Sequence, residues 1–530
     1  MYLNGPREHS RKMLASLQRD IRRLEEKQRI LEEQLYTLHD PHHCDRCWEK
    51  HSRIEDELQE LNEKQLILEQ DQVTFQTLLA CIKYPILTLP DEITSLIFIH
   101  LVADSDRDHA PSPNTAPLLL LQVCRRWQHI ALTTPQLWAR LELSTLMLPP
   151  HYLGKVPRWF ERAKALPLSL HLTAHDADDM DDLRTLVSLD ASRLESLTAV
   201  LPLEAFPLDN TQFPLLECVT LGPLCFRPAV EVYPPYTCFE NAPRLREVHL
   251  LKPATPALFI LPSAQLTKFT GHGFTADQCL DFLRCAPSLV ECTLHVELDD
   301  PPVDRSTRAD LPQLKSFCIE RSEYSEEVEH TSAAAILDLL DAPLLERLEL
   351  VGLPNLHHYA DEMVRFFSRV SKSLREFSYI SVVGDEEDTE AAYLDPVAAN
   401  WLDYLPHLTH IAFYNPDQEF MDRFIDKLVE TTFLPRLRSL RLIDYTLSVD
   451  LVFLMVIFTR SCINLSAVGR DQLEAFDLIW RDVNFAQSLR DEAQLLAPCV
   501  KEGRQFFIGV PGVNELAKWI EFPSPVYFHV

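Results

Sequence analysis

The chain has 530 residues, of which 46% are hydrophobic, so it is long enough for several domains or for one long array of repeats. Its 79 acidic and 50 basic side chains give a formal net charge of −29 at pH 7. Such a chain repels phosphate backbones and anionic lipid surfaces, which argues against nucleic acid or a membrane as its main partner. An acidic surface suits solubility or a basic partner.

Thirteen cysteines lie at irregular spacing, and residues 1–30 are charged throughout without the apolar core of a signal peptide. We therefore expect reduced thiols and a cytoplasmic or nuclear protein. The most apolar run, residues 451–458, is far shorter than the ~20 residues that span a bilayer, so no membrane anchor is predicted.

Residues 1–84 contain two runs of apolar residues with heptad spacing. The first extends from Leu14 to Leu38 with Gln28 at one polar position, and the second extends from Ile54 to Ile82. This pattern predicts a helical hairpin or a coiled coil, because each apolar stripe has to be covered by a second helix. Folding back and self-association through residues 1–84 both satisfy the pattern.

The segment between these two runs carries potential metal ligands. Cys44, Cys47 and His51, together with one of His39, His42 or His43, could hold a tetrahedral zinc ion. A single C-x-x-C pair is a weak zinc signal, and a polar turn between helices needs no metal. The plain turn is therefore favoured, and no cofactor is predicted.

Residues 85–143 read as three short helices. Pro90 followed by Asp91 and Glu92 is typical of a helix start, because proline needs no hydrogen-bond acceptor there and acidic groups favour the positive end of the helix dipole. One face of this first helix is formed by Ile93, Leu96, Ile97, His100 and Leu101.

Two further helices are expected in this segment. A second helix from Pro117 onward places Leu120, Val123, Cys124, Trp127 and Ala131 on one stripe, and Thr134-Pro135 predicts the start of a third. Cys124 is expected to be a small buried side chain rather than a reactive thiol. Three short helices cannot hide all of the large apolar groups here, so some of these groups are expected to contact a partner.

These residues resemble the F-box, and in particular the F-box-like domain of mushroom-forming fungi. The matching motifs are Leu89-Pro90-Asp91-Glu92-Ile93, Leu96-Ile97-Phe98, Val123-Cys124-Arg125-Arg126-Trp127 and Thr134-Pro135-Gln136-Leu137-Trp138. Their order within about sixty residues makes the resemblance specific. It implies that the helices dock on the Skp-type adaptor of a cullin-RING ligase. The residues assigned to that contact are Leu89, Pro90, Ile93, Leu96, Val123, Cys124 and Trp127.

Residues 144–470 repeat the phrase L-x-x-L-x-L at spacings of about 20 to 35 residues, often after a proline, which predicts irregular leucine-rich repeats. The phrases centre on Leu197, Val219, Val248, Phe269, Cys292, Phe317, Leu348, Phe377, Ile411 and Leu440. Helices are expected at 276–285, 333–340 and 420–428. Such units stack into a solenoid whose ends need caps, here the three-helix unit and residues 471–530, with a helix expected from Gln472 to Ala486.

Polar residues that flank the strand phrases would line the inner face of such a solenoid. They are Arg246, His249, Glu291, His295, Lys315, Arg347, Glu349, His410, Arg438 and Arg441. A solvated strand face is the simpler interpretation of any single one of them. Gly271-His272-Gly273 is expected to be a turn rather than a phosphate site, and the acidic run 384–390 a solvated loop.

The sequence therefore predicts an α/β chain: an N-terminal helical hairpin or coiled coil, a three-helix F-box-like unit, an irregular leucine-rich-repeat solenoid and a C-terminal cap. No motif for nucleophilic or metal-assisted catalysis is recognised, so an enzyme is not predicted. What the resemblance implies is a substrate receptor of an SCF-type ubiquitin ligase that holds an unknown target protein on the repeats. The alternative is a non-catalytic scaffold in which the three helices only cap the solenoid.

Overall fold

The computed structural model of the chain describes residues 5–37, 45–81, 89–103, 111–144, 155–174, 185, 187–188, 190–202, 206, 211–224, 235–251, 258–297, 307–321, 332–353, 356–381, 396–430, 432–445, 451–462, 470–480, 494–510 and 513–514. The acidic run 384–390 and the histidines at 39, 42 and 43 lie outside these residues. The chain divides into two compact units, Met1–Ile97 and Phe98–Val530.

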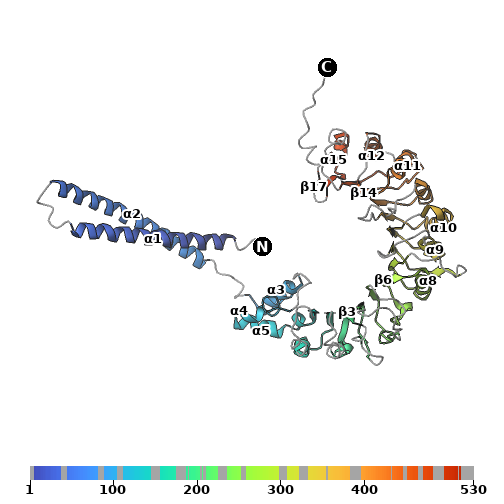
Figure 1. Cartoon of the computed structure of the whole chain (residues 1–530), viewed down its shortest axis with the longest axis horizontal. Coiled ribbons are helices and arrows are strands. Elements are labelled where there is room, and N and C mark those ends of the chain that lie inside the picture. The colour runs from blue at the N-terminus through green and yellow to red at the C-terminus, as the bar shows by residue number, and fades with distance from the viewer. Residues whose placement is uncertain are drawn as a thin grey trace, which may run out of the picture. The chain divides into compact units, whose positions relative to one another are not determined.

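The first unit contains two long helices, α1 (Gly5–Thr37) and α2 (Asp45–Cys81), which lie antiparallel to each other (Figure 1). The heptad pattern explains which side chains meet, because apolar residues of the predicted stripes are buried, among them Ile21, Leu31 and Leu61. The polar position Gln28 is also buried, and its amide donates a hydrogen bond of 2.9 Å to Asn62 Oδ1 of α2.

Four short helical elements follow. They are α3 (Asp91–Ala103), α4 (Leu120–Val123), α5 (Arg125–Thr133) and the 3-10 helix η3 (Pro135–Trp138). The expected third helix is therefore a single 3-10 turn. Strand β1 (Arg140–Ser144) begins two residues after η3 and pairs with β2, so this helical segment leads directly into the sheet.

The second unit is built on one long sheet. Among the described residues it contains fourteen parallel strands, and a fifteenth, β17, pairs antiparallel with β16. In spatial order the strands are β1, β2 (Leu168–Thr173), β3 (Leu194–Pro202), β4 (Cys218–Leu224), β5 (Glu247–Leu250), β6 (Lys268–Phe274), β7 (Glu291–Val296), β9 (Ser316–Arg321), β11 (Arg347–Val351), β12 (Glu376–Ile380), β13 (His410–Tyr414), β14 (Ser439–Tyr445), β15 (Ala475–Trp480), β16 (Gln505–Val510) and β17 (Val513–Asn514). Strands β8 (Ala309–Asp310) and β10 (Leu340–Asp341) form a separate pair.

The predicted strand phrases agree with this sheet, since all ten coincide with strands of the series β3 to β14. The helix expected from Gln472 to Ala486 is wrong over residues 475–480, which form β15. There the side chains of Phe476 and Leu478 are buried while Asp477 between them is only partly covered, a period of two that marks a strand. The parallel series therefore continues to β16.

Helical segments connect the strands and lie along the outer side of the curved sheet in the second unit (Figure 1). They are α6 (Val156–Arg162), η6 (Ala191–Arg193), η8 (Ser263–Gln265), α8 (Ala276–Cys285), α9 (Ser332–Leu339), η9 (Leu356–Tyr359), α10 (Ala360–Val370), η10 (Pro396–Tyr404), α11 (Gln418–Val429), α12 (Leu451–Cys462), η12 (Gln494–Leu496) and α15 (Ala497–Lys501). The expected helices at 276–285, 333–340 and 420–428 are confirmed as α8, α9 and α11. We call the sheet face opposite these helices the open face.

The core lies between the sheet and the helices. Strand side chains that point toward the helices are buried and aromatic in several places: the ring of Phe269 stacks on Phe282 of α8 with centroids 3.9 Å apart, and Phe413 contacts Phe420 of α11 edge to face. Buried arginines join neighbouring repeats as well. For example, the Arg460 guanidinium donates to the main-chain oxygens of Phe433 and Leu434, both at 3.1 Å.

Gly271 and Gly273 lie in strand β6 and not in the turn expected from the sequence. Gly273 adopts a positive φ of 70°, and the pairing register with β7 shifts between His272 and Phe274. This irregularity turns the ring of Phe274 into the core beside Gly271. The turn expected at these glycines is thus a bulge inside a strand.

The cysteines do not all match the expected reduced state. Seven described cysteines form no disulfide bond, namely Cys124, Cys218, Cys238, Cys279, Cys285, Cys292 and Cys318. Cys499, which is buried in α15, is disulfide-bonded. Within the described part of the chain, no helix combines the length and the apolar character needed to cross a bilayer.

Candidate functional site

Helix α3 begins where its sequence predicts. Pro90 precedes the first helical residue, Asp91 and Glu92 occupy the first turn, and the Thr94 N–H donates to Pro90 O at 3.1 Å. Proline supplies the fixed φ of a first turn, and the acidic side chains interact favourably with the positive end of the helix dipole. Leu89 is half-buried and Pro90 is exposed at this helix start.

The buried face of α3 is not its most regular apolar stripe. Thr94 and Phe98, one turn apart, are each 1% exposed. The predicted stripe instead points to solvent, since the large apolar side chains with the highest exposure on this helix are Ile93 (44%), Leu96 (51%), Ile97 (39%) and Leu101 (46%). Helix α3 therefore has a core-facing side and, separately, an apolar side that nothing in the described residues covers.

The second expected helix is interrupted. Cys124 has extended backbone angles (φ −160°, ψ 165°) and separates α4 from α5, with the Gln128 N–H donating to Cys124 O at 2.9 Å. A continuous helix across this point is thus wrong, and the stripe expected from it is split. Leu120 is buried and Cys124 is half-buried, whereas Val123 is 51% exposed. Leu119, just before α4, is also exposed.

Trp127 has a supporting position rather than an exposed one. It is half-buried, and its ring meets that of Phe98 edge to face with centroids 5.0 Å apart. Its indole N–H is buried and has no hydrogen-bond partner among the described residues. Of the seven residues assigned to the adaptor contact, the structure therefore places Pro90, Ile93, Leu96 and Val123 at the surface, while Leu89, Cys124 and Trp127 are partly covered.

The sequence analysis placed Ile97 and Leu101 on one face of the first helix, but it did not include them or Leu119 among the contact residues. Their exposure depends on which side of α3 faces the core, and on the break at Cys124, so no signal in the sequence separates them from core residues. Their exposure adds them to the candidate residues. We define the exposed apolar set by the exposure of each side chain: it comprises Ile93, Leu96 and Ile97 of the first unit and Leu101, Leu119 and Val123 of the second.

The 3-10 turn η3 packs against the first strands of the sheet. Trp138 is fully buried, and its indole N–H donates to Ala131 O at 2.8 Å. Thr134, expected to cap this turn, instead donates its hydroxyl to Ile130 O at 2.7 Å. The Arg162 guanidinium lies over the Trp138 ring, 4.4 Å from its centroid.

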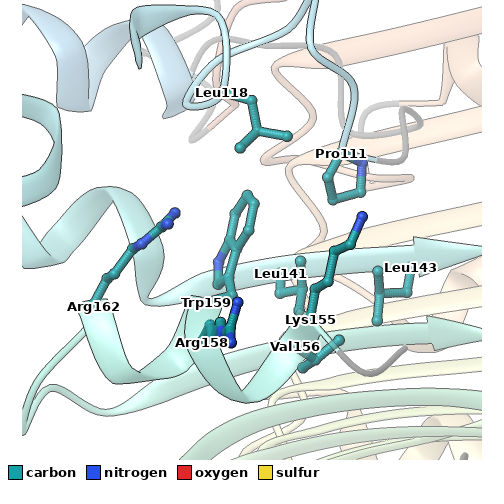
Figure 2. Close-up of a pocket in the computed structure, with 9 residues that line it drawn as sticks. All are labelled: Pro111, Leu118, Leu141, Leu143, Lys155, Val156, Arg158, Trp159 and Arg162. Carbon is teal, nitrogen blue, oxygen red and sulfur yellow. The ribbon is translucent and has the colours of Figure 1, made fainter. Parts of the chain in front are cut away.

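A cavity of about 260 Å³ lies beside this turn, within the second unit. Its apolar lining comes mainly from Leu118, Leu141, Leu143, Val156 and Trp159, and three basic residues, Lys155, Arg158 and Arg162, join the lining. Figure 2 shows the ring of Trp159 standing between the Arg162 and Lys155 side chains. This concentration of basic groups contrasts with the acidic chain as a whole.

The open face of the sheet carries rows of polar side chains from successive strands. The imidazoles of His272 and His295 stack with centroids 3.6 Å apart and 8° between their planes, and His295 Nδ1 lies 3.0 Å from Glu320 Oε2. The predicted inner-face residues His295, Glu291 and Arg441 all make contacts here: Lys268 pairs with Glu291 at 3.4 Å, and Arg441 pairs with Asp477 at 2.8 Å.

Three of the predicted inner-face residues lie just before a strand rather than in it. Arg246 precedes β5, Lys315 precedes β9 and Arg438 precedes β14. The sequence analysis missed His272, Cys318, Glu320 and Asp477 on the same face. These residues alternate with buried strand residues, and that period of two could have placed them on the open face.

Two neighbouring carboxylates on this face have pKa values shifted in opposite directions. The hydrogen bond from His295 lowers the pKa of Glu320. Burial, and then the charge of Glu320, raises the pKa of Glu349, whose side chain has no hydrogen bond or ion pair among the described residues. Burial also raises the pKa of the Cys318 thiol to about 12, with Glu349 and Glu320 adding to the effect. Cys318 is therefore a protonated, unreactive thiol.

The possible zinc ligands near the tip of the first two helices remain a prediction. Cys44 lies outside the described residues, and Cys47 falls in the first turn of α2. His51 Nδ1 lies 3.3 Å from Glu55 Oε2 one turn along the same helix.

A comparison with protein families matches residues 86–144 to the F-box-like family. The match begins just before α3 and ends at the last residue of β1, so it covers all of the exposed apolar set. No curated protein matches the chain.

Proposed function

We propose, from the F-box-like domain at residues 86–144, that this chain is the substrate-recognition subunit of an SCF-type ubiquitin ligase. In this proposal the exposed apolar set binds a Skp-type adaptor, and the sheet holds a target protein. The observation that carries it is that the regular apolar stripe of α3 points to solvent.

Burial of apolar area supplies the driving force for adaptor binding. Transfer of such side chains out of water contributes roughly 25 cal/mol per Å², and a few large apolar anchors commonly dominate an interface. Ile93, Leu96 and Ile97 are side chains of this kind. F-box proteins typically bind without catalysing a reaction. In the proposed assembly the chain performs no bond chemistry, and tethering raises the effective concentration of the target's lysines near the ligase.

The target would bind on the open face of the sheet. We propose that the parallel strands are the strand side of irregular leucine-rich repeats of the fungal F-box type, because ten of them coincide with an L-x-x-L-x-L phrase and most strands are followed by a helical segment. The paired and stacked side chains of His272, His295 and Glu320 give this face a defined polar surface.

Co-purification of the full chain with a Skp-type adaptor tests the proposal. Ile93→Asp with Leu96→Asp should abolish co-purification, because two charges would be desolvated in the interface. The matched control is Val452→Asp with Met455→Asp, since these exposed apolar residues lie on α12, far along the chain from the F-box-like domain. The control should retain the adaptor. Equal binding by both double variants would contradict the proposal.

A second pair of residues tests the helix start separately. Leu89→Ala with Pro90→Ala should also abolish adaptor binding while the circular dichroism spectrum stays native. If binding persists, residues 89–90 are not part of the adaptor contact.

The alternative function, a scaffold in which the three helices only cap the repeats, is favoured by one observation. On α2, Leu66, Ile67 and Val73 are 57%, 58% and 62% exposed, which suits self-association through residues 1–84. Sedimentation of the wild-type chain against Ile67→Lys with Val73→Lys tests this function. A scaffold requires wild-type oligomers that the variant loses, together with no adaptor binding by either chain.

We propose a cytoplasmic or nuclear location for such a receptor. Seven cysteines among the described residues form no disulfide bond, which supports a reducing compartment, although Cys499 is disulfide-bonded. Fractionation of cells that express a tagged chain would test the location, and recovery in a secretory compartment would contradict it.

A further inference from the structure

Three potential metal ligands meet on two neighbouring strands of the open face. Cys218 of β4 lies opposite Glu247 of β5 in the pairing register, and His249 is two residues further along β5 on the same face. One ligand atom from each side chain, Sγ, a carboxylate oxygen and a ring nitrogen, lies within 4.8 Å of the other two. Among the described residues this is the one group of three with such spacing.

The sheet fixes the positions of these three side chains. The residues that alternate with them, Val219, Leu221, Val248 and Leu250, are fully buried against the core. Main-chain hydrogen bonds flank the group, from Glu247 N to Glu217 O at 3.0 Å and from Leu251 N to Leu221 O at 2.8 Å. A site carried on paired strands holds its ligands more firmly than a site on a loop.

Two of the three ligand groups are not committed to other partners. Among the described residues, no ion pair or hydrogen bond is found for the side chains of Glu247 and His249, whereas the Cys218 thiol is hydrogen-bonded to the Ser196 hydroxyl. The nearby Lys268 ammonium is paired with Glu291 at 3.4 Å.

We propose that Cys218, Glu247 and His249 form a zinc site. A thiolate, an imidazole and a carboxylate form a ligand set that suits Zn²⁺, which commonly takes three protein ligands and leaves a fourth position open. Here the fourth position faces away from the core, where water or a side chain of a bound protein can occupy it. The site does not depend on adaptor binding or on the proposed function.

Proton release accompanies binding. A histidine binds zinc through the lone pair of its neutral ring. A cysteine binds zinc as the thiolate, so zinc displaces the Cys218 proton to solvent as the Zn–S bond forms. Zinc affinity should therefore rise with pH.

Cobalt titration of the full chain tests the site. Cys44→Ser with Cys47→Ser serves as the background, which removes the thiols of the other possible zinc site. Co²⁺ should form a 1:1 complex with a near-ultraviolet thiolate-to-cobalt band and the visible bands of tetrahedral cobalt, and Zn²⁺ should displace it. Adding Cys218→Ser should remove the thiolate band, and adding His249→Ala should weaken affinity by about 100-fold or more, since even the loss of a supporting residue around a metal costs 10- to 100-fold.

Cys285→Ser is the matched control, because this free thiol is exposed on α8 and outside the group. It should leave the cobalt spectrum unchanged. A thiolate band that survives Cys218→Ser, or the absence of any such band in the background chain, would overturn the proposal.

A measurement on the wild-type chain tests the site without substitutions, so its result does not depend on whether the variants fold. Zinc should protect Cys218 but not Cys285 from alkylation in the wild-type chain, read by mass spectrometry of the peptides. Equal alkylation of Cys218 with and without zinc would overturn the proposal as well.

Discussion

The indole rings of Trp138 and Trp159 meet edge to face, with centroids 4.9 Å apart and 75° between their planes. Trp138 ends the F-box-like helices in η3, and Trp159 belongs to α6, the first helix after β1. The Trp159 N–H also donates to Arg140 O at 3.2 Å, at the start of β1. This contact makes residues 98–138 part of the same packed unit as the sheet.

Trp138→Ala should destabilise the second unit. Removal of a fully buried indole leaves a cavity and costs about 3 to 5 kcal/mol, and it also removes the hydrogen bond to Ala131 O. Denaturant unfolding measures the change. Tyr404→Ala is the control. Because the Tyr404 side chain is 42% exposed, its removal should lower the free energy of unfolding much less. A change below about 1 kcal/mol for Trp138→Ala would contradict the role given to this contact.

Two residues of α4 should separate adaptor binding from folding. Val123 is 51% exposed and Leu120 is 1% exposed, although they are only three residues apart. Val123→Asp should lose adaptor binding and keep the wild-type melting temperature, while Leu120→Asp should lower that temperature because a carboxylate would be buried. Undiminished adaptor binding by Val123→Asp would exclude this residue from the interface.

The ionised carboxylates of Glu320 and Glu349 should have opposite effects on folding stability, and both effects should depend on pH. The folded-state pKa of Glu320 lies below its ordinary value of 4.5, so its contribution to stability is present above that pH and is lost as pH falls through the folded pKa. Glu320→Gln should therefore destabilise the protein at pH 7 by less than about 1 kcal/mol, since the pair is partly exposed to solvent.

For Glu349 the folded-state pKa is raised, so its charged form opposes folding at pH 7 and the cost disappears below pH 4.5. Glu349→Gln should stabilise the protein at pH 7 and have no effect near pH 3. Urea unfolding at both pH values checks the pair of variants. If both variants changed the free energy of unfolding at pH 7 in the same direction, the opposite pKa shifts given to Glu320 and Glu349 would be contradicted.

Gly271→Ala should destabilise the protein although alanine is a small residue. A Cβ atom at this position would lie 2.5 Å from Phe274 Cε2 and 2.7 Å from Phe269 Cε1, so both buried rings would have to move. Overpacking of this kind costs about 1 to 3 kcal/mol. Gly222→Ala is the control, since its new methyl group would lie 3.2 Å from the nearest atom of Val200. Equal thermal unfolding of the two variants would contradict this account.

Local sequence patterns were sufficient to predict much of the fold. The L-x-x-L-x-L phrases located ten parallel strands, because a strand with one buried face alternates with a period of two. They did not locate β1, β2, β15 or β16, whose phrases are incomplete or follow no proline. The break between α4 and α5 at Cys124 was also not predicted. A single extended residue between two helices leaves the helical spacing of the apolar residues in the sequence nearly unchanged.

The sequence by itself determined the start of α3, the heptad stripes of α1 and α2, the positions of ten strands and the resemblance to the F-box, since each depends on neighbouring residues or on a short spacing. Only the tertiary structure decided which side of α3 faces the core, because both sides are apolar. It also brought Cys218 beside Glu247 and His249 and set His272 on His295. Those contacts join residues more than twenty positions apart, and strand pairing, not local spacing, determines which of them meet.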